Sequence, residues 1–286
     1  MDGCVAVRSA RHRREALTLA MQPLLEEVAA IAKGAGDLIL QIYATDFAVR
    51  GKSDASPVTA ADEAAEAFIV PALRALQPDW PVVAEEAASR GEALATAFRW
   101  WLVDPLDGTR EFVSRNGEFT VNIALIEDGV PVLGVVHIPV QDRLFAGFTD
   151  PTGQVAWVEE QGVRRAIRCR TASAAGVTLA GSRSHGDETV TQAWIDQCVH
   201  SGKGGFVVAE RLVAGSSLKF GLIAAGQADV YPRFGRTMEW DTAAGDAVLR
   251  AAGGVVTDLS GFALRYGKPG FENPHFVAWG GAPITA

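Results

Sequence analysis

The sequence lacks the features that define several protein classes. Only three of its 286 residues are cysteines, and Cys4, Cys169 and Cys198 form neither a close pair nor a metal-binding spacing. This scarcity favours a reducing compartment over a secreted fold held by disulfides. No apolar run is long enough to span a bilayer. The chain also has no Gly-x-Ser-x-Gly elbow and no cysteine-nucleophile motif, so nothing indicates a covalent hydrolase.

Positive charge is also in short supply. The chain has 34 acidic residues against 26 Lys and Arg, which gives a formal net charge of −8. Because nonspecific binding to nucleic acid depends on positive charge, we expect no nucleic-acid partner. The apolar content of 48% and charged content of 21% are typical of a globular protein, as one large domain or two of ordinary size. An anionic substrate would need cations and a few basic side chains to reverse the field locally.

The N-terminus carries four arginines within residues 1–14, followed by a short, mildly apolar stretch. This stretch is too short for a signal peptide and runs straight into Glu26-Glu27. We therefore predict that residues 1–20 are a disordered extension, with Met21 as an alternative start of translation. We expect a cytoplasmic protein, and the sequence leaves open a peripheral association with the inner membrane.

Periodic patterns predict two halves. Apolar residues between Leu24 and Ile42 recur at helical spacing, and Thr59 with Asp62 forms a capping box for a second helix. Residues 119–158 alternate like the strands of an antiparallel meander. From about residue 171, strand and helix patterns alternate along the chain. We expect an N-terminal α+β half, residues 21–170, and a C-terminal α/β half, residues 171–286.

The most informative stretch is WWLVDPLDGT, from Trp100 to Thr109. Its first four residues are short, apolar and bulky, which predicts a buried strand. Pro105 cannot donate a hydrogen bond to a neighbouring strand, so we expect the strand to end there. The Gly108-Thr109 pair then predicts the start of a helix, whose free N–H groups favour a phosphate.

Asp104 and Asp107 lie between that strand and that helix. Two carboxylates alone repel a phosphate, whereas a divalent cation between them attracts it, so the stretch predicts metal-assisted phosphate chemistry. The alternative is an ordinary pair of turns, because Asp-Pro and Asp-Gly are common turn formers. The spacing does not fit an EF-hand loop. An aspartyl-phosphate phosphatase has one residue between its two aspartates, whereas two intervene here.

Two more acidic positions lie at the ends of predicted elements. Glu85-Glu86 follows the apolar strand segment Pro81–Ala84, and Asp241 lies where a helix should begin. Taken alone, Asp241 is better explained as the N-cap of that helix. Combined with the central aspartates, however, these carboxylates are the oxygen ligands that Mg²⁺ prefers.

The motifs resemble those of the inositol monophosphatase superfamily of lithium-sensitive, Mg²⁺-dependent phosphatases. The resemblance rests on Asp104–Thr109, Glu85-Glu86 and Trp240–Gly245, and it extends from about Leu24 to the C-terminus. Within the superfamily the chain is most similar to the bacterial CysQ-type 3'(2'),5'-bisphosphate nucleotidases, and that similarity rests on residues 110–125, 182–185, 215–220 and 231–234. The resemblance implies a layered α/β/α/β/α sandwich with the metal site at the junction of its halves.

The resemblance also implies a catalytic apparatus. Two or three Mg²⁺ ions would be held by Glu85, Asp104, the Leu106 carbonyl, Asp107 and Asp241. Gly108 and Thr109 would bind the scissile phosphate. Asp62 would orient the Thr109 hydroxyl, which together with Glu85 positions the attacking water.

Further residues are implied to contact the substrate or to lie close to the metals. Lys52 would belong to a loop near the metal site. The nucleotide and its second phosphate would be contacted by Ser184, His185, Gly215, Ser216, Lys219, Arg233 and Asp241. Considered without the resemblance, a histidine such as His185 is more often a surface or packing residue, and Lys219 and Arg233 could be ordinary surface charges.

We therefore predict a phosphatase that converts 3'-phosphoadenosine 5'-phosphate to AMP and phosphate, with a role in sulfur assimilation. Two alternatives stay open at this point. One is an inositol or sugar monophosphate phosphatase on the same scaffold, and the other is a nucleotide-binding regulatory protein. Asp62, Glu85 and Thr109 together count against the second, because a binding protein does not need to activate water. A homodimer is also left open.

Overall fold

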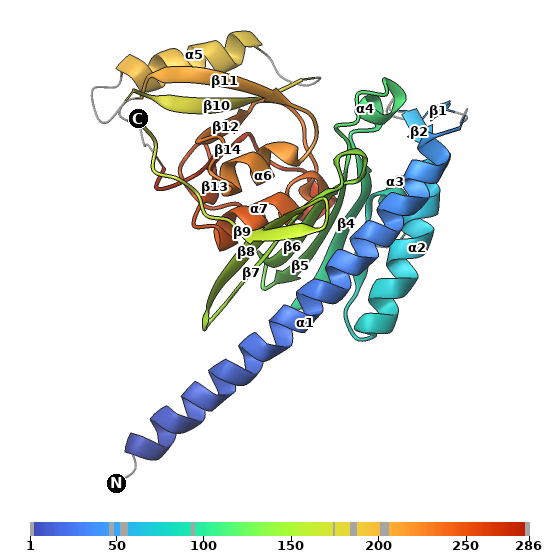
Figure 1. Ribbon diagram of the computed structural model, residues 1–286, viewed down its shortest axis with the longest axis vertical. Helices are drawn as coiled ribbons and strands as arrows, with labels where there is room; N and C mark the ends of the chain where they lie inside the picture. The colour runs from blue at the N-terminus through green and yellow to red at the C-terminus, as the bar shows by residue number, and fades with distance from the viewer. Residues whose placement is uncertain are drawn as a thin grey trace.

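The computed structural model describes residues 21–45, 60–92, 95–173, 175–183, 188–198 and 206–283; outside these ranges only the bounds of helices and strands are given. The predicted disordered extension, residues 1–20, therefore lies outside the described residues. The chain forms five layers, with helices and sheets alternating (Figure 1). The predicted α/β/α/β/α sandwich is confirmed.

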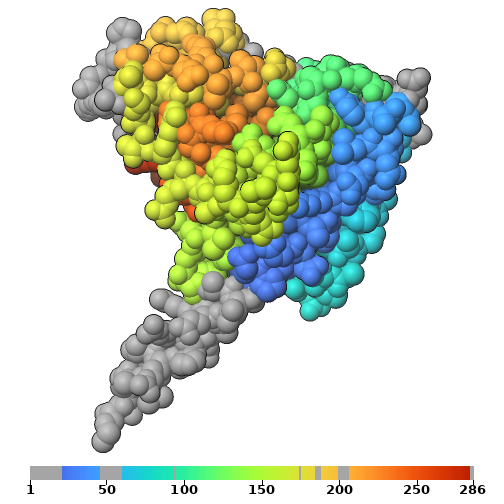
Figure 2. All heavy atoms as spheres, viewed as in Figure 1, coloured from blue at the N-terminus to red at the C-terminus, as the bar shows by residue number. Residues whose placement is uncertain are grey.

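Helices α1 (Gly3–Tyr43) and α2 (Ala60–Leu76) form the first outer layer. The apolar face predicted between Leu24 and Ile42 is confirmed in part. Leu24, Val28 and Ala35 are buried, whereas Ile31, Leu38 and Ile42 are half-buried. The centre of the buried face includes Leu25 and Ile39, which the predicted spacing left out. The two helices pack against each other and α1 lies across the large sheet, where its surface meets that of the sheet's last strands (Figures 1 and 2). Ion pairs from Lys33 to Glu159 and from Arg164 to Glu26 join α1 to that edge.

The large sheet has seven strands in the order in which they occur along the chain. They are β3 (Val82–Ala84), β4 (Arg99–Asp107), β5 (Thr120–Glu127), β6 (Val130–Ile138), β7 (Arg143–Asp150), β8 (Gly153–Glu160) and β9 (Val163–Ala166). From β4 to β9 all neighbours are antiparallel, which confirms the meander. Asp128 and Gly129, with φ of 47° and 69°, make the tight turn between β5 and β6.

The predicted end of the central strand at Pro105 is wrong. Strand β4 continues to Asp107 through an irregularity in its pairing with β5. Asp104 pairs with Asn122 and Asp107 with Thr120, so two residues of β4 stand opposite Val121 alone. Such a bulge tolerates a proline because the extra residue need not donate to the neighbouring strand.

The small sheet has five strands in the order β11-β10-β12-β14-β13. Their bounds are β10 (Val177–Ser182), β11 (Val208–Ala214), β12 (Val230–Arg233), β13 (Val255–Asp258) and β14 (Phe276–Trp279). Strand β10 is parallel to both its neighbours and β14 antiparallel to both of its own, so the sheet is mixed. Helix α5 (Glu188–His200) covers the outer face of this sheet (Figure 1).

The middle layer consists of α6 (Leu218–Ala224) and α7 (Ala243–Ala251), which lie between the two sheets. Phe145 of the large sheet, Phe220 of α6 and Phe276 of the small sheet belong to one buried cluster. The two predicted halves, 21–170 and 171–286, thus share a core, and their division into domains stays a proposal.

The remaining elements are short. They are α3 (Glu85–Ser89), α4 (Thr109–Val113), the hairpin of β1 (Val49–Gly51) with β2 (Pro57–Thr59), and the 3₁₀ turns η1 (Pro139–Gln141), η2 (Glu239–Asp241) and η3 (Pro269–Phe271). Sequence patterns missed α3, β9 and β14. Over the described part of the chain, no helix combines the length and the apolar character needed to cross a membrane.

Glycine at position 134 of β6 allows α7 to approach the large sheet closely. A Cβ added there would lie 2.3 Å from the Ala244 carbonyl oxygen and 2.7 Å from the Ala247 Cβ. Both partners are buried in α7, so neither can move without shifting the helix. The position of α7, which follows directly on Asp241 and Thr242, therefore depends on this glycine.

We expect Gly134→Ala to lower the free energy of unfolding by about 1–3 kcal/mol, because it overpacks the contact between β6 and α7. Urea denaturation followed by circular dichroism measures the change. Gly153→Ala is the matched control, since a Cβ there meets no atom within 4 Å. Equal stability of the Gly134→Ala protein and the wild type would contradict the tight contact.

Candidate active site

A cleft of about 190 Å³ opens where the end of β4, the start of α4 and the segments before α6 and α7 meet. Its lining residues come from both halves of the chain. They include ten of the predicted site residues: Glu85, Asp104, Leu106, Asp107, Gly108, Thr109, Ser216, Lys219, Arg233 and Asp241. The structure therefore gathers most of the predicted site in one place.

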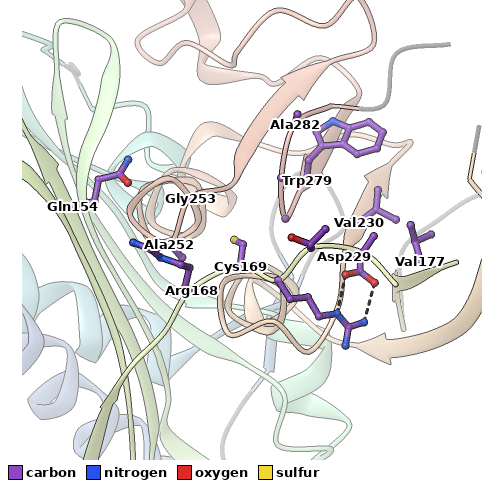
Figure 3. A pocket seen from close by; sticks show the side chains of 15 residues that line it. Gln154, Arg168, Cys169, Val177, Asp229, Val230, Ala252, Gly253, Trp279 and Ala282 are labelled. Carbon is purple, nitrogen blue, oxygen red and sulfur yellow. Dashed lines mark hydrogen bonds and ion pairs between the residues drawn. The ribbon is translucent and has the colours of Figure 1, made fainter. Parts of the chain in front are cut away.

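A larger cavity, about 470 Å³, lies elsewhere and has different chemistry (Figure 3). Asp229 is the only carboxylate among its lining residues, and both of its oxygens accept hydrogen bonds at 2.8 Å from the Arg170 guanidinium. Burial raises the pKa of the Cys169 thiol to about 12, so this thiol is not a reactive nucleophile. The smaller, acidic cleft is the better candidate for catalysis.

The carboxylates of the cleft repel one another in a buried setting. Asp104 is 1% exposed, and burial raises its pKa well above the usual range. The charges of Glu85, Asp107, Asp241 and Asp62 raise it further, in that order. Burial and the charge of Asp107 likewise raise the pKa of Asp241 well above its usual range. Oxygen donors packed this closely match the donor set of a hard divalent cation.

Asp107 is held by three polar side chains. Its Oδ2 accepts a hydrogen bond from Ser217 Oγ at 2.9 Å, and Thr120 Oγ1 and Asn122 Nδ2 lie 3.3 and 3.4 Å away. Asn122 also donates to Ser217 Oγ at 2.9 Å. Sequence reasoning missed all three residues. The available signal was the pair of polar residues, Thr120 and Asn122, on one face of the otherwise apolar strand β5.

Gly108 has a φ of +92°, a conformation that favours glycine. A Cβ at this position would lie 2.0 Å from Ser216 Oγ, so glycine is also required for space. Ser216 Oγ in turn donates to the Asp107 carbonyl at 2.9 Å. This contact joins the loop after β4 to the loop before α6. The predicted helix start at Gly108-Thr109 is confirmed by α4.

Lys219 is buried rather than a surface charge, so that alternative is wrong. Its side chain is 2% exposed and its Nζ donates to the carbonyls of Ala214 and Ser216, at 3.1 and 2.5 Å. Burial lowers its pKa to about 8, although Asp107 opposes the shift. Arg233, 9% exposed, lines the same cleft.

Asp241 ends the 3₁₀ turn η2, and the helix α7 has Thr242 at its N-cap position. The N-cap interpretation of Asp241 is therefore wrong. Its Oδ2 instead accepts a hydrogen bond from the Met238 N–H at 2.9 Å. This bond fixes the carboxylate against its own turn, beside the cleft.

Glu85 begins α3, a helix that the sequence patterns did not predict. Glu66 of α2 stabilises its first turn, since Glu66 Oε2 accepts hydrogen bonds from the N–H groups of Glu86 and Ala87 at 2.9 and 3.3 Å. Asp62, also in α2, is fully buried and close enough to Asp104 to raise its pKa. Helix α2 thus supports the start of α3 through Glu66 and adds a further buried carboxylate, Asp62, to the acidic cluster.

Several predicted residues play other parts or are not described. The Leu106 N–H donates to Asp104 Oδ1 at 3.1 Å, and Leu106 lines the cleft. Gly215 does not line the cleft, and its N–H donates to Glu118 Oε2 at 2.8 Å. Lys52, Ser184, His185 and the Thr59 side chain lie outside the described residues, so their roles stay predictions.

The fold agrees with comparisons to known proteins. The model of the inositol monophosphatase family matches residues 20–278, so the chain belongs to the inositol monophosphatase family. It is 47% identical to the 3'(2'),5'-bisphosphate nucleotidase CysQ of Salmonella typhimurium over 256 residues, which are 88% of this chain and 98% of that protein. The Escherichia coli protein of the same name is 46% identical with the same coverage.

Solved structures agree with the family and the fold. The crystal structure of CysQ from Bacteroides thetaiotaomicron has a TM-score of 0.72 at 36% identity, covering 91% of this chain and 98% of that one. An inositol monophosphatase from Zymomonas mobilis has a TM-score of 0.71 at 26% identity, covering 92% and 94%. The family and the fold that the motifs predicted are thus confirmed.

We expect Asp104→Asn to raise the Tm of the protein in chelator, because it removes one of the mutually repelling buried charges. The gain should be about 2–4 °C for each kcal/mol of repulsion relieved. A raised carboxyl pKa costs stability at pH values above the unfolded pKa, so the gain should shrink as the pH falls into the ordinary carboxyl range. Calorimetry at pH 8 and pH 5 measures both effects.

Asp79→Asn, at an exposed carboxylate between α2 and β3, is the control for this variant. It should leave the Tm in chelator unchanged at both pH values. A lower Tm for Asp104→Asn than for the wild type would show that the cluster is not under electrostatic strain.

Proposed function

We propose that this protein is a Mg²⁺-dependent 3'(2'),5'-bisphosphate nucleotidase that converts 3'-phosphoadenosine 5'-phosphate to AMP and phosphate. The observation that carries this proposal is the convergence of the four predicted metal-binding carboxylates, Glu85, Asp104, Asp107 and Asp241, with two buried cations, Lys219 and Arg233, in one cleft. Relatives at 46–47% identity over most of the chain bear the name of this activity, which supports the substrate class. The chain is accordingly a phosphatase rather than a silent binding protein.

The acidic cluster fits the metals that this activity needs. Glu85, Asp104, the Leu106 carbonyl, Asp107 and Asp241 would hold two or three Mg²⁺ ions. When bound, the ions supply water of lowered pKa and positive charge to offset the charge on the leaving oxygen. The raised pKa values of Asp104 and Asp241 indicate that the basic side chains of the cleft do not fully neutralise its carboxylates.

The chain itself supplies orientation. Gly108 and Thr109 bind the scissile phosphate in the proposed arrangement, at the start of α4. Asp62 orients the Thr109 hydroxyl, and Thr109 with Glu85 positions the attacking water. Because phosphoryl transfer asks a protein mainly for positioning and charge stabilisation, these roles need no covalent nucleophile.

The second phosphate of the nucleotide is assigned to the C-terminal half. Arg233 lines the cleft and is the candidate for a charge-assisted contact to that phosphate. Lys219 lines the same cleft and contributes a second positive charge. Its hydrogen bonds to the Ala214 and Ser216 carbonyls stabilise the loop that carries Ser216. Ser184, His185 and Gly215 complete the proposed set. A cytoplasmic location, a role in sulfur assimilation and a homodimer stay predictions.

We expect Asp104→Asn to remove nearly all Mg²⁺-dependent phosphate release while the fold stays intact. Chelator should have the same effect on the wild type, and added Mg²⁺ should reverse it. Phosphate release from 3'-phosphoadenosine 5'-phosphate, with and without Mg²⁺, measures both effects, and circular dichroism checks the fold. Turnover that survives in the variant would remove Asp104 from the proposed metal site.

We expect the wild type to show a much higher kcat/KM for 3'-phosphoadenosine 5'-phosphate than for inositol 1-phosphate. A panel of nucleotide, inositol and sugar phosphates measures this preference. Losing a charge-assisted contact costs about 1.5–3 kcal/mol, or roughly ten- to a hundredfold in binding. Arg233→Ala should therefore erode the preference by that factor and affect a small monophosphate less.

Arg265→Ala is the matched control, because Arg265 is 57% exposed and does not line the cleft. It should leave the preference unchanged. If the wild type favours inositol 1-phosphate, the monophosphatase alternative replaces the nucleotidase. Equal slowing of both substrates by Arg233→Ala would remove Arg233 from the recognition of the second phosphate.

A further inference from the structure

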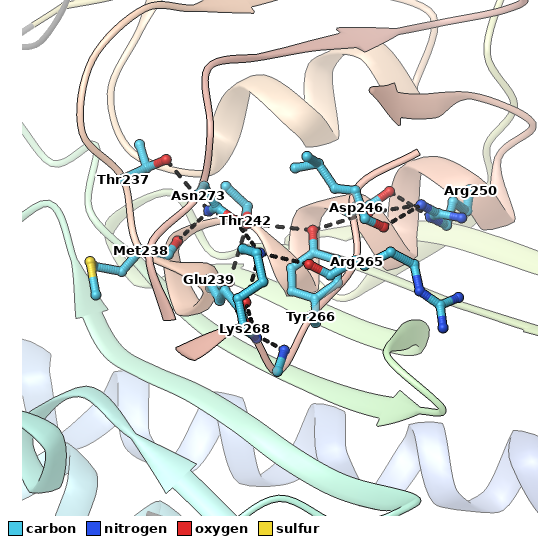
Figure 4. Close-up of polar contacts among 12 residues, drawn as sticks. Thr237, Met238, Glu239, Thr242, Asp246, Arg250, Arg265, Tyr266, Lys268 and Asn273 are labelled. Atoms are coloured by element: carbon cyan, nitrogen blue, oxygen red, sulfur yellow. Dashed lines mark hydrogen bonds and ion pairs between the residues drawn. The ribbon is translucent and has the colours of Figure 1, made fainter. Parts of the chain in front are cut away.

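The turn that carries Asp241 is connected to a neighbouring segment by a buried polar network (Figure 4). On one side of the turn, residues 237–242, lies the cleft; on the other lies the segment 265–273, which leads into β14. Glu239 and Asn273 connect the turn to this segment, and the Tyr266 hydroxyl adds a longer hydrogen bond to Thr242 Oγ1 at 3.4 Å. Neither Glu239 nor Asn273 lines the cleft, and both are buried, at 0% and 6% exposure.

Asn273 joins the start of the turn to its end. Its Nδ2 donates to the Met238 carbonyl at 2.7 Å and to Thr242 Oγ1 at 3.0 Å. Its backbone N–H donates to the Thr237 carbonyl at 2.9 Å. One side chain thus contacts the residues on both sides of Glu239–Asp241.

Glu239 ties the middle of the turn to the same segment. Its Oε2 accepts a hydrogen bond from the Gly267 N–H at 2.6 Å, and its Oε1 accepts one from the Lys268 N–H at 2.9 Å. Lys268 Nζ lies 2.7 Å from the same Oε1, so this buried carboxylate is also charge-paired. The Thr242 hydroxyl closes the network by donating to the Glu239 carbonyl at 3.1 Å.

The Asp241 carboxylate needs these contacts because neighbouring carboxylates repel it. Asp107 and Glu85 repel its carboxylate, and its turn is a 3₁₀ element of only three residues. A short turn has few internal hydrogen bonds with which to resist displacement. Ligand carboxylates bind a cation tightly only when their own position is fixed by further contacts.

We propose that Asn273 and Glu239 are positioning residues that hold Asp241 ready to bind Mg²⁺. The inference rests on the proposed function, and it adds to it a pair of residues outside the cleft. Asn273 sets the two ends of the turn, and Glu239 anchors its centre. Asn273→Ala removes the bonds to Met238 and Thr242 and lets the turn relax away from the other carboxylates.

The test is calorimetric titration of the full-length protein with Mg²⁺ alone, without substrate. Loss of a contact that orients a metal ligand typically costs about 10–100-fold in metal affinity. We expect the Kd for Mg²⁺ to rise by about that factor in Asn273→Ala. The Mg²⁺ concentration for half-maximal phosphate release should rise with it, while kcat at saturating Mg²⁺ changes little.

Thr257→Val is the matched control, because it removes another buried hydrogen bond of the small sheet, from Trp279 Nε1 to Thr257 Oγ1 at 3.2 Å. It should lower the Tm without changing the Kd for Mg²⁺. Glu239→Gln is a milder second variant in case Asn273→Ala does not fold. It removes the charge pairing with Lys268 and should raise the Kd in the same direction by less.

The outcomes separate the inference from the function on which it rests. A wild type that binds Mg²⁺ and a folded Asn273→Ala or Glu239→Gln protein that binds it equally well would overturn the inference alone. A rise in Kd for Thr257→Val as large as that for Asn273→Ala would overturn it as well, by showing a general effect of lost stability. A wild type that neither binds Mg²⁺ nor releases phosphate would overturn the proposed function and the inference together.

Discussion

Repulsion between the carboxylates of one partly buried cleft is the constraint on which the rest of this structure depends. Burial raises the pKa values of Asp104 and Asp241, and the charges of Glu85 and Asp107 raise both further. A folded chain keeps such a cluster only if other contacts outweigh its cost. The same repulsion makes the cleft receptive to divalent cations, so the strain and the proposed function have one physical source.

The structure meets this constraint by fixing each carboxylate from a different element. The bulge in β4 and the hydrogen bond from Ser217 hold the pair Asp104 and Asp107. Glu66 supports the helix turn that begins with Glu85, and the network of Glu239 and Asn273 lies behind the turn of Asp241. No one of these supports is near another in the sequence.

The shared core brings those supports together. Helix α7 lies against Gly134 of the large sheet and also packs beneath the small sheet, so it sets how far Asp241 stands from β4. Ser216 and Ser217 make the corresponding link from the start of α6, by bonding to Asp107. The cleft is therefore a property of the packing between layers, and a small change in that packing would alter the distances among the carboxylates.

The sequence by itself determined most of the longer elements and predicted the chemistry of the site. The helical spacing from Leu24 and the alternation in residues 119–158 predict their elements, because the period at which apolar residues recur decides which face of a helix or strand is buried. The pair Asp104 and Asp107 could be recognised because it follows directly on an apolar run. Only the tertiary structure decided that β4 passes Pro105, that Lys219 is buried and that Asp241 ends a 3₁₀ turn. It also decided that Thr120, Asn122, Ser217 and Asn273 support the cluster. These features depend on contacts between residues far apart in the chain, and no local pattern encodes which distant partner a polar side chain will meet.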